Sequence, residues 1–514
     1  MIRTIVFLLA AFSFSPAQAQ LGAAGAEYFS RDTLRAVFSQ GYAAPSPLTP
    51  ASMASADMDG DGIEDLILGW PGIVLFNPSQ NSAAGGVSFL YGSNSGLSRS
   101  TSRQFFLEPI GEVNAGERFG IAVATGNIDG QGPTLAVGAS GDRVGANIAG
   151  GSASVIYSNQ SGLILSSAEI WSQESPDIIG GAETNDLFGR VVAMGDFNAN
   201  GFDDLLVTMP WEDIGDISRA GAFTVINGIS AGLVSDANQF IDQDSENVPG
   251  SPEAGDQFGH SAAVGNFNCD FYDDAAIGAP LEDIGDVEDA GAVAIFYGSP
   301  LGFFHNDIAN PRRVDNWHQD TDGVIGSVET GDEFGDSLAV GDFDGDGCDD
   351  LAIGVSSEDV DSNSVSDGGA VAVLYGSASG LNASRDQFFT ESNISAPFSA
   401  QANALFGATL TTADFDSDGH DDLATASTGS PGRVTLIFGS PSGLDGDRVK
   451  VLTSELLGTN CGGSLRAESM TAGDWNNDNF PDLAVGVDSG LHLIYSGDIV
   501  FSDRFQTVSG SPCF

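Results

Sequence analysis

The chain has 514 residues, with 71 Asp and Glu against 17 Lys and Arg, and a formal net charge of -54. This excess of negative charge argues against nucleic-acid binding, because phosphate contacts need cationic side chains. Four cysteines are too few for a disulfide scaffold in a chain of this length. We therefore expect an acidic protein whose surplus carboxylates form a solvated surface, in preference to a binding patch for a cationic ligand.

The first 19 residues have the layout of a secretory signal peptide. An apolar run over residues 5–14 is followed by Ala17-Gln18-Ala19, a typical cleavage site. The alternative is an uncleaved membrane anchor, but the run is shorter than the roughly 20 residues that span a bilayer. We expect an exported protein, secreted, extracellular or associated with a cell surface, with a periplasmic location also compatible. No transmembrane segment is expected in the mature chain, which we predict to be a monomer.

One loop pattern recurs along the chain. Asp342, Asp344, Asp346 and Asp350 occupy positions 1, 3, 5 and 9 of a tight turn, with Gly347 at position 6 and an apolar strand leaving it. Six such loops supply the side-chain ligands that we expect for a cation: Asp57, Asp59, Asp61 and Asp65; Asp196, Asn198, Asn200 and Asp204; Asn266, Asn268, Asp270 and Asp274; Asp342, Asp344, Asp346 and Asp350; Asp414, Asp416, Asp418 and Asp422; Asp474, Asn476, Asp478 and Asp482.

These ligands indicate calcium, because Ca²⁺ takes six to eight oxygens from carboxylates, amides and backbone carbonyls. The expected carbonyl ligands, at position 7, are Ile63, Phe202, Tyr272, Cys348, His420 and Phe480. Affinity should rise with the number of carboxylates, so the loops beginning at Asp57, Asp342 and Asp414 should bind most tightly. Asp-rich turns without metal are the alternative. A seventh copy beginning at Asn127 lacks the final carboxylate, so about six sites are expected.

The seven loops begin 60 to 76 residues apart, which indicates a repeat architecture. Most units carry a Phe-Gly pair before an alternating strand, the loop with its exit strand, a Gly-Ala-Val type strand with a Gly-Ser-x-x-Gly-Leu turn, and a looser outer strand. Four strands in each of seven units predict an all-β, seven-bladed propeller over residues 51–500, with calcium loops between the first and second strands. The Phe-Gly pairs are Phe119-Gly120, Phe188-Gly189, Phe258-Gly259, Phe334-Gly335 and Phe406-Gly407.

The ring must close, because an open sheet edge promotes aggregation. In the N-terminal segment, residues 20–50, the stretch Leu34–Phe38 is expected to complete the seventh blade. The rival is residues 499–508, which overlap the C-terminal tail at 501–514.

With loop, strand and turn recurring together, the chain resembles FG-GAP repeat proteins and is similar to the N-terminal propeller of integrin α subunits. The resemblance covers roughly residues 27 to 500 and implies a ligand-binding or cell-adhesion module with an extracellular protein or glycan as partner. The first and last units lack the Phe-Gly pair, and Phe271 and Asn479 replace the position 6 glycine in two loops.

Enzyme chemistry finds little support in the sequence. The one Gly-x-Ser-x-Gly match, Gly228 to Gly232, falls where other units have a hairpin turn, so we expect a hairpin there and not a nucleophile elbow. The five histidines have no metal-ligand spacing. We predict no catalytic residues and no organic cofactor. The alternatives are a carbohydrate-active lyase or hydrolase built on the propeller, and a structural envelope protein.

A second set of acidic loops, at 211–216, 281–286 and 357–361, should lie on the face opposite the calcium loops. The resemblance implies that this is the partner-binding face. Trp70, Trp211 and Trp317 either offer stacking surfaces there or pack between blades, and we favour packing for most of them.

The cysteine pairing is only partly predictable. A bond between Cys461 and Cys513 would tie the C-terminal tail to the last repeat, and we favour it. Cys269 and Cys348 lie in two successive loops and could pair or stay free.

Overall fold

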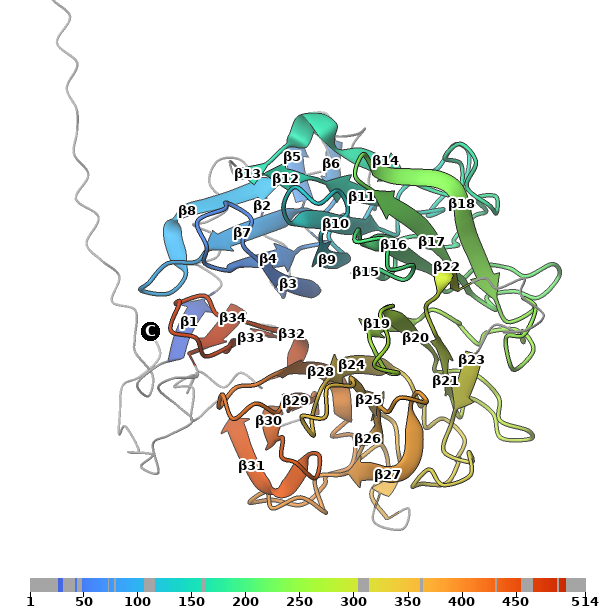
Figure 1. The fold of residues 1–514 in the computed structure, drawn as a ribbon, viewed down its shortest axis with the longest axis vertical. Coiled ribbons are helices and arrows are strands. Elements are labelled where there is room, and N and C mark those ends of the chain that lie inside the picture. Colours follow the sequence, from blue (N-terminus) through green and yellow to red (C-terminus); the bar gives the residue numbers. More distant parts are fainter. Residues whose placement is uncertain are drawn as a thin grey trace, which may run out of the picture.

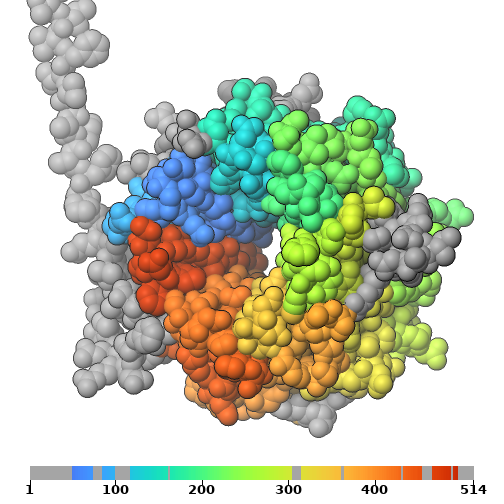
Figure 2. Space-filling view, viewed as in Figure 1, coloured from blue at the N-terminus to red at the C-terminus, as the bar shows by residue number. Residues whose placement is uncertain are grey.

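The computed structural model describes residues 26–30, 42–43 and 49–495, apart from 73, 78–79, 106–115, 160–161, 304–313, 361–363, 430–431, 454–465 and 488–489. Seven antiparallel four-stranded sheets follow one another around a ring, as Figure 1 shows in sequence colours from blue to red. The predicted all-β, seven-bladed propeller is confirmed. The ring is hollow at its centre (Figure 2).

Each of the first six blades runs in chain order from its inner to its outer strand. The strands of blades one to three are β3 Ser52–Ala56, β4 Asp65–Gly69, β7 Val87–Tyr91 and β8 Ser98–Phe105; β9 Ala122–Gly126, β10 Thr134–Ala139, β11 Ser152–Ile156 and β14 Glu169–Trp171; β15 Val192–Gly195, β16 Asp204–Met209, β17 Ala222–Ile229 and β18 Gly232–Asp242. Those of blades four to six are β19 Ser261–Gly265, β20 Asp274–Ala279, β21 Ala292–Phe296 and β23 Val314–Trp317; β24 Ser337–Gly341, β25 Asp350–Val355, β26 Ala370–Tyr375 and β27 Asn382–Phe389; β28 Phe406–Ala413, β29 Asp422–Ser427, β30 Arg433–Phe438 and β31 Asp445–Thr453.

Blade seven joins the two ends of the described chain. Its strands are β32 Ala467–Gly473, β33 Asp482–Val487, β34 Gly490–Ile494 and, as the outer strand, β1 Ala26–Ser30. The closing strand therefore comes from the N-terminal segment but lies ahead of the stretch 34–38 that we expected. Residues 34–38 and the rival 499–508 lie outside the described residues.

A few short elements lie outside the blades. The strands β2 Tyr42–Ala43, β5 Val74–Asn77 and β6 Gln80–Ala83 form a small sheet, with β5 and β6 inserted between the second and third strands of blade one. The others are the hairpin of β12 Ser158–Asn159 and β13 Gly162–Leu163, the strand β22 Pro300–Phe303 and the 3₁₀ turn η1 Leu165–Ser167.

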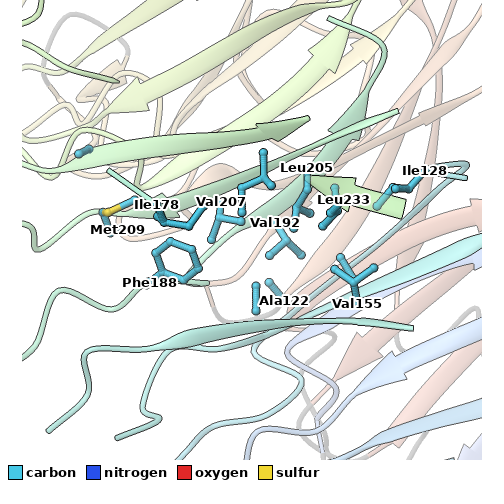
Figure 3. Packing of buried hydrophobic residues seen from close by; sticks show 14 of the residues in the cluster. Ala122, Ile128, Val155, Ile178, Phe188, Val192, Leu205, Val207, Met209 and Leu233 are labelled. Carbon is cyan, nitrogen blue, oxygen red and sulfur yellow. The ribbon is translucent and has the colours of Figure 1, made fainter. Parts of the chain in front are cut away.

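The core lies between neighbouring blades. The second strand of every blade is buried along its whole length, because both of its faces pack on adjacent sheets. Between blades two and three, Ala122 and Val155 pack with Val192 and Val207 (Figure 3). These apolar contacts account for the runs of Ala, Val, Leu and Ile in the exit strands.

The Phe-Gly pairs fix the contact between successive blades. Phe188 is fully buried and forms a parallel bridge with Gly151, at the entrance to the third strand of the preceding blade. Gly151 has a φ of 85°, and a Cβ there would lie 2.2 Å from the Phe188 carbonyl oxygen. Only glycine fits this position, which explains why a glycine precedes the third strand in several blades.

The ring has two faces, each formed by one set of loops. The loops joining first to second strands, which include all six expected metal loops, form the Asp-loop face. The loops joining second to third strands form the opposite face, since alternate turns of an antiparallel sheet lie at opposite ends.

Candidate metal centres

The Asp loops are bent by hydrogen bonds from their own backbone to their own side chains. In blade five, Asp342 Oδ1 accepts from the Asp346 amide at 3.0 Å, and Asp342 Oδ2 accepts from the Gly347 amide at 2.9 Å. Asp346 Oδ1 in turn accepts from the Cys348 amide at 2.9 Å. The loops beginning at Asp57, Asp196, Asp414 and Asp474 make corresponding bonds.

This bending brings carboxylates together. In three loops, one oxygen from each of three Asp side chains lies within 4.8 Å of the others. The three sets are Asp57, Asp59 and Asp61; Asp342, Asp344 and Asp350; and Asp414, Asp416 and Asp422. All the donors are hard oxygens, so the residues present fit a hard divalent cation such as Ca²⁺.

Three further loops hold fewer carboxylates. Asn198 at position 3 of the blade-three loop donates to Asp204 Oδ2 at 2.7 Å. Asn479 replaces glycine in blade seven by adopting a φ of 67°, a conformation that asparagine tolerates. Phe271, at the same position in blade four, is 91 % exposed.

The loop that lacks the final carboxylate begins at Asn127 and lies in blade two. There, Thr134 Oγ1 accepts a hydrogen bond from the Ile128 amide at 3.4 Å, as the carboxylate of Asp65 accepts one from the Met58 amide in blade one.

The Asp at position 9 is buried in all six loops, and in blades one and three to six it accepts a hydrogen bond from the amide of a glycine at or just after the end of the third strand. Asp350 accepts the Phe343 amide at 2.9 Å through Oδ2 and the Gly376 amide at 2.8 Å through Oδ1. Burial raises the pKa of Asp350 to about 8, with the charges of Asp344 and Asp342 adding to the shift. Burial likewise raises the pKa of Asp274 and Asp422 to about 8. A cation beside such a group would favour its ionised form.

The residue at position 8 has a role that the sequence analysis missed. Asp273 Oδ2 accepts from the Asp196 amide of the preceding blade at 2.8 Å, and the Asp273 amide donates to the Asp196 carbonyl at 3.2 Å. Asp203, Asp349 and Asp421 make the same pair of bonds to the loops before them. An acidic doublet at the start of the exit strand in five of the seven units marks this position in the sequence, but it does not reveal the partner.

The Cys269–Cys348 disulfide joins the loops of blades four and five, with Cα atoms 4.8 Å apart. Their sulfurs lie near a carboxylate oxygen of Asp346, but disulfide sulfurs are not thiolate ligands. The bond settles a pairing that the sequence left open. Cys461 and Cys513 lie outside the described residues.

The opposite face contains a second set of buried carboxylates. Glu212, Glu282 and Glu358, one in each acidic loop, accept a hydrogen bond from the amide nitrogen of Gln173, Gln243 and Gln319 respectively. Burial raises the pKa of all three glutamates to about 8, with nearby carboxylates adding to the shift. These pairs hold each acidic loop against the connection that enters its blade.

The tryptophans mostly pack, as we expected. Trp70 is 1 % exposed and donates to Ser88 Oγ at 2.7 Å, and Trp317 lies against the apolar cluster between blades four and five. Trp211 is half-buried beneath the guanidinium of Arg219, 4.6 Å from its ring centroid. Trp317 is half-buried as well, so both rings keep part of their surface exposed.

The serine of the Gly-x-Ser-x-Gly match and two of the histidines lie in a turn, beside a carboxylate and in the core, respectively. Ser230 lies in the two-residue turn between Ile229 and Gly232, which are paired across β17 and β18, so the predicted hairpin is confirmed. His260 Nε2 lies 3.5 Å from Asp336 Oδ1. Burial lowers the pKa of His492 to about 4.

Comparison with known proteins agrees with this geometry. The FG-GAP repeat model matches residues 188–226, 258–296, 334–374 and 406–437. Integrin alpha-PS5 of Drosophila melanogaster is 28 % identical over 246 residues, 47 % of this chain and 21 % of its own length. Integrin alpha-5 of Xenopus laevis is 26 % identical over 257 residues, 49 % of this chain and 20 % of its own.

A relative of another kind is also similar. Phosphatidylinositol-glycan-specific phospholipase D of Rattus norvegicus is 32 % identical over 176 residues, 34 % of this chain and 19 % of its own length. The matched region thus spans about a fifth of each of these relatives. Within the described residues, no helix is long and apolar enough to cross a bilayer. The chain thus contains four FG-GAP repeats, folds as a seven-bladed β-propeller and is similar in sequence to integrin α subunits.

Proposed function

We propose that the chain is an exported propeller that binds calcium in its Asp loops and acts as a ligand-binding or adhesion module. The observation that carries the metal proposal is the convergence of Asp342, Asp344 and Asp350, with one oxygen of each within 4.8 Å of the others. The raised pKa of Asp350, caused chiefly by burial, adds support, because a bound cation would offset the unfavourable burial of its charge. The role of the ions would be structural.

The ligand is proposed to bind on the opposite face. Its acidic loops are held by the buried pairs Gln173–Glu212, Gln243–Glu282 and Gln319–Glu358, which give a rigid platform. The similarity to integrin α subunits supports an extracellular protein or glycan as partner. The half-buried Trp211 gives this face an aromatic surface for stacking.

Calcium removal tests the metal proposal. A site with a dissociation constant on the order of 10⁻⁴ to 10⁻³ M would stabilise the fold by about 1.4 to 2.7 kcal/mol at 10 mM Ca²⁺. We expect the melting temperature to fall markedly in a chelator, and up to about six ions per chain by metal analysis, one for each loop with its final carboxylate. An unchanged melting temperature and no bound calcium would show that the loops are turns alone.

A single-loop variant makes the test local. Asp346→Asn keeps the Oδ1 acceptor for the Cys348 amide but removes one carboxylate from the blade-five loop. We expect part of the calcium-dependent stabilisation to be lost. The matched control is Asp359→Asn on the opposite face, where Asp359 Oδ1 accepts from the Asp367 amide at 2.9 Å. Equal losses in both variants would contradict the metal role of Asp346.

An enzyme remains the second candidate, favoured by the similarity to a protein named as a phospholipase D. Parallel screens for binding to glycans and matrix proteins, and for cleavage of polysaccharides and glycosylphosphatidylinositol, separate the two. Turnover that is lost in an opposite-face variant such as Trp211→Ala would replace the binding proposal. If the screens detect no binding and no turnover, a structural envelope protein is favoured.

A further inference from the structure

Two arginines of the outer strands reach onto the Asp-loop face. Arg385, in β27, places Nη2 in hydrogen-bond contact with Asp344 Oδ2. Arg448, in β31, makes the same contact with Asp416 Oδ2, and its Nη1 lies 3.1 Å from Asp418 Oδ2. Asp344 and Asp416 are both position 3 residues, so each arginine binds a carboxylate that belongs to an expected calcium ligand set.

Each arginine is held in place by an aromatic side chain as well. The guanidinium of Arg385 lies over Tyr375, 4.8 Å from the ring centroid, and that of Arg448 lies over Phe438 at the same distance. Tyr375 and Phe438 both end the third strand of their blade. The same aromatic, arginine and aspartate therefore recur in two blades, which argues that the arrangement is built into the fold.

The two aspartates are buried, whereas their arginine partners remain partly exposed. The side chains of Asp344 and Asp416 are 2 % exposed, while those of Arg385 and Arg448 are 47 % and 46 % exposed. An aspartate so far removed from water needs a cation or hydrogen-bond donors close by. The arginines are accessible enough to move when another cation arrives.

The other loops offer an internal comparison. Blades three, four and seven have Asn198, Asn268 and Asn476 at position 3, a residue with no charge to neutralise. In blade three, Ala237 stands four residues after the turn leucine, where blades five and six have their arginines. Counted over the four side-chain ligand positions and its arginine, the loop of blade five or of blade six has the same formal charge as the blade-seven loop, which has three Asp and one Asn.

We propose that Arg385 and Arg448 are built-in counter-cations that neutralise the position 3 carboxylate when calcium is absent and lower the calcium affinity of their loops. This inference rests on the calcium binding proposed above. Bound Ca²⁺ repels the nearby guanidinium, so each arginine stabilises the metal-free loop more than the loaded one. By thermodynamic linkage, the arginine weakens calcium binding by the same free energy as bound calcium weakens the contact between the arginine and its aspartate. The loops of blades five and six then bind calcium less tightly than their number of carboxylates alone would give.

The test compares Arg385→Gln and Arg448→Gln, singly and together, with wild type. We expect calcium to bind the altered loop about fivefold more tightly by calorimetric titration, within the usual range of such couplings. The melting temperature should fall by several degrees in metal-free protein and by less in excess Ca²⁺. Arg385→Lys, which keeps the charge, should restore most of the wild-type affinity.

The control is Arg219→Gln, which removes the same charge from the guanidinium over Trp211 on the opposite face. It should leave the calcium affinity unchanged. Unaltered affinity in Arg385→Gln and Arg448→Gln, with equal losses of stability with and without calcium, would make the arginines structural and overturn the inference alone. Absence of calcium binding in the wild type would overturn the proposed function, and this inference with it.

Discussion

At the scale of single residues, the buried glutamates of the opposite face should make stability depend on pH. Glu358 has its pKa raised to about 8, chiefly by burial, so between pH 5 and 8 the folded chain retains a proton that the unfolded chain releases. Stability from this group is full at low pH and is lost as pH rises towards 8. Glu358→Gln keeps an oxygen acceptor for Gln319 and removes the titration. We expect its melting temperature to fall less steeply across this range, at constant calcium.

The matched control for this variant is Glu288→Gln, at an exposed residue of the corresponding loop in blade four. It makes the same change in formal charge and should leave the slope of melting temperature against pH unchanged. Identical slopes in Glu358→Gln and the wild type would show that Glu358 is already ionised in the folded protein.

At the scale of the loops and strands, the position 8 carboxylates should hold neighbouring blades together whether or not metal is bound. Asp273→Ala leaves the half-buried Asp196 amide without its acceptor, which costs about 1 kcal/mol, the low end of the range for a buried donor. Asp273→Asn keeps an acceptor and should cost less. Urea unfolding with and without Ca²⁺ should show a similar loss from Asp273→Ala in both conditions. A loss seen only with calcium would assign Asp273 to the metal site instead.

The elements could be predicted because their signals are local and repeated. The loop with its exit strand recurs in every unit, so the blade count and the positions of the second strands followed from the sequence. The bonds from Asp273 to Asp196 and from Arg385 to Asp344 could not, because 77 and 41 residues separate the partners. The closing strand was misplaced for a similar reason, since its partner β34 lies at the far end of the chain.

At the scale of the whole ring, strand β1 should be required for a stable closed propeller. A chain that begins at residue 31 leaves the edge of β34 unpaired and exposes its amides and carbonyls. We expect a lower melting temperature and a shift to larger species in size-exclusion chromatography. Removal of residues 501–514, combined with Cys461→Ser so that no cysteine loses its expected partner, is the control deletion and should lower the melting temperature less. The reverse result would give the closing role to the tail.

The pairing of β1 with β34 also determines how the ring would respond to a pulling force. Ala26, where β1 begins, lies opposite Ile494, where β34 ends, so the flanking chain leaves both strands at the same end of the pair. Tension between these two points would load the hydrogen bonds one after another, as in a zipper, and not all together, as in shear. Under such a load blade seven would peel open first, while the Cys269–Cys348 disulfide keeps blades four and five joined on the far side of the ring.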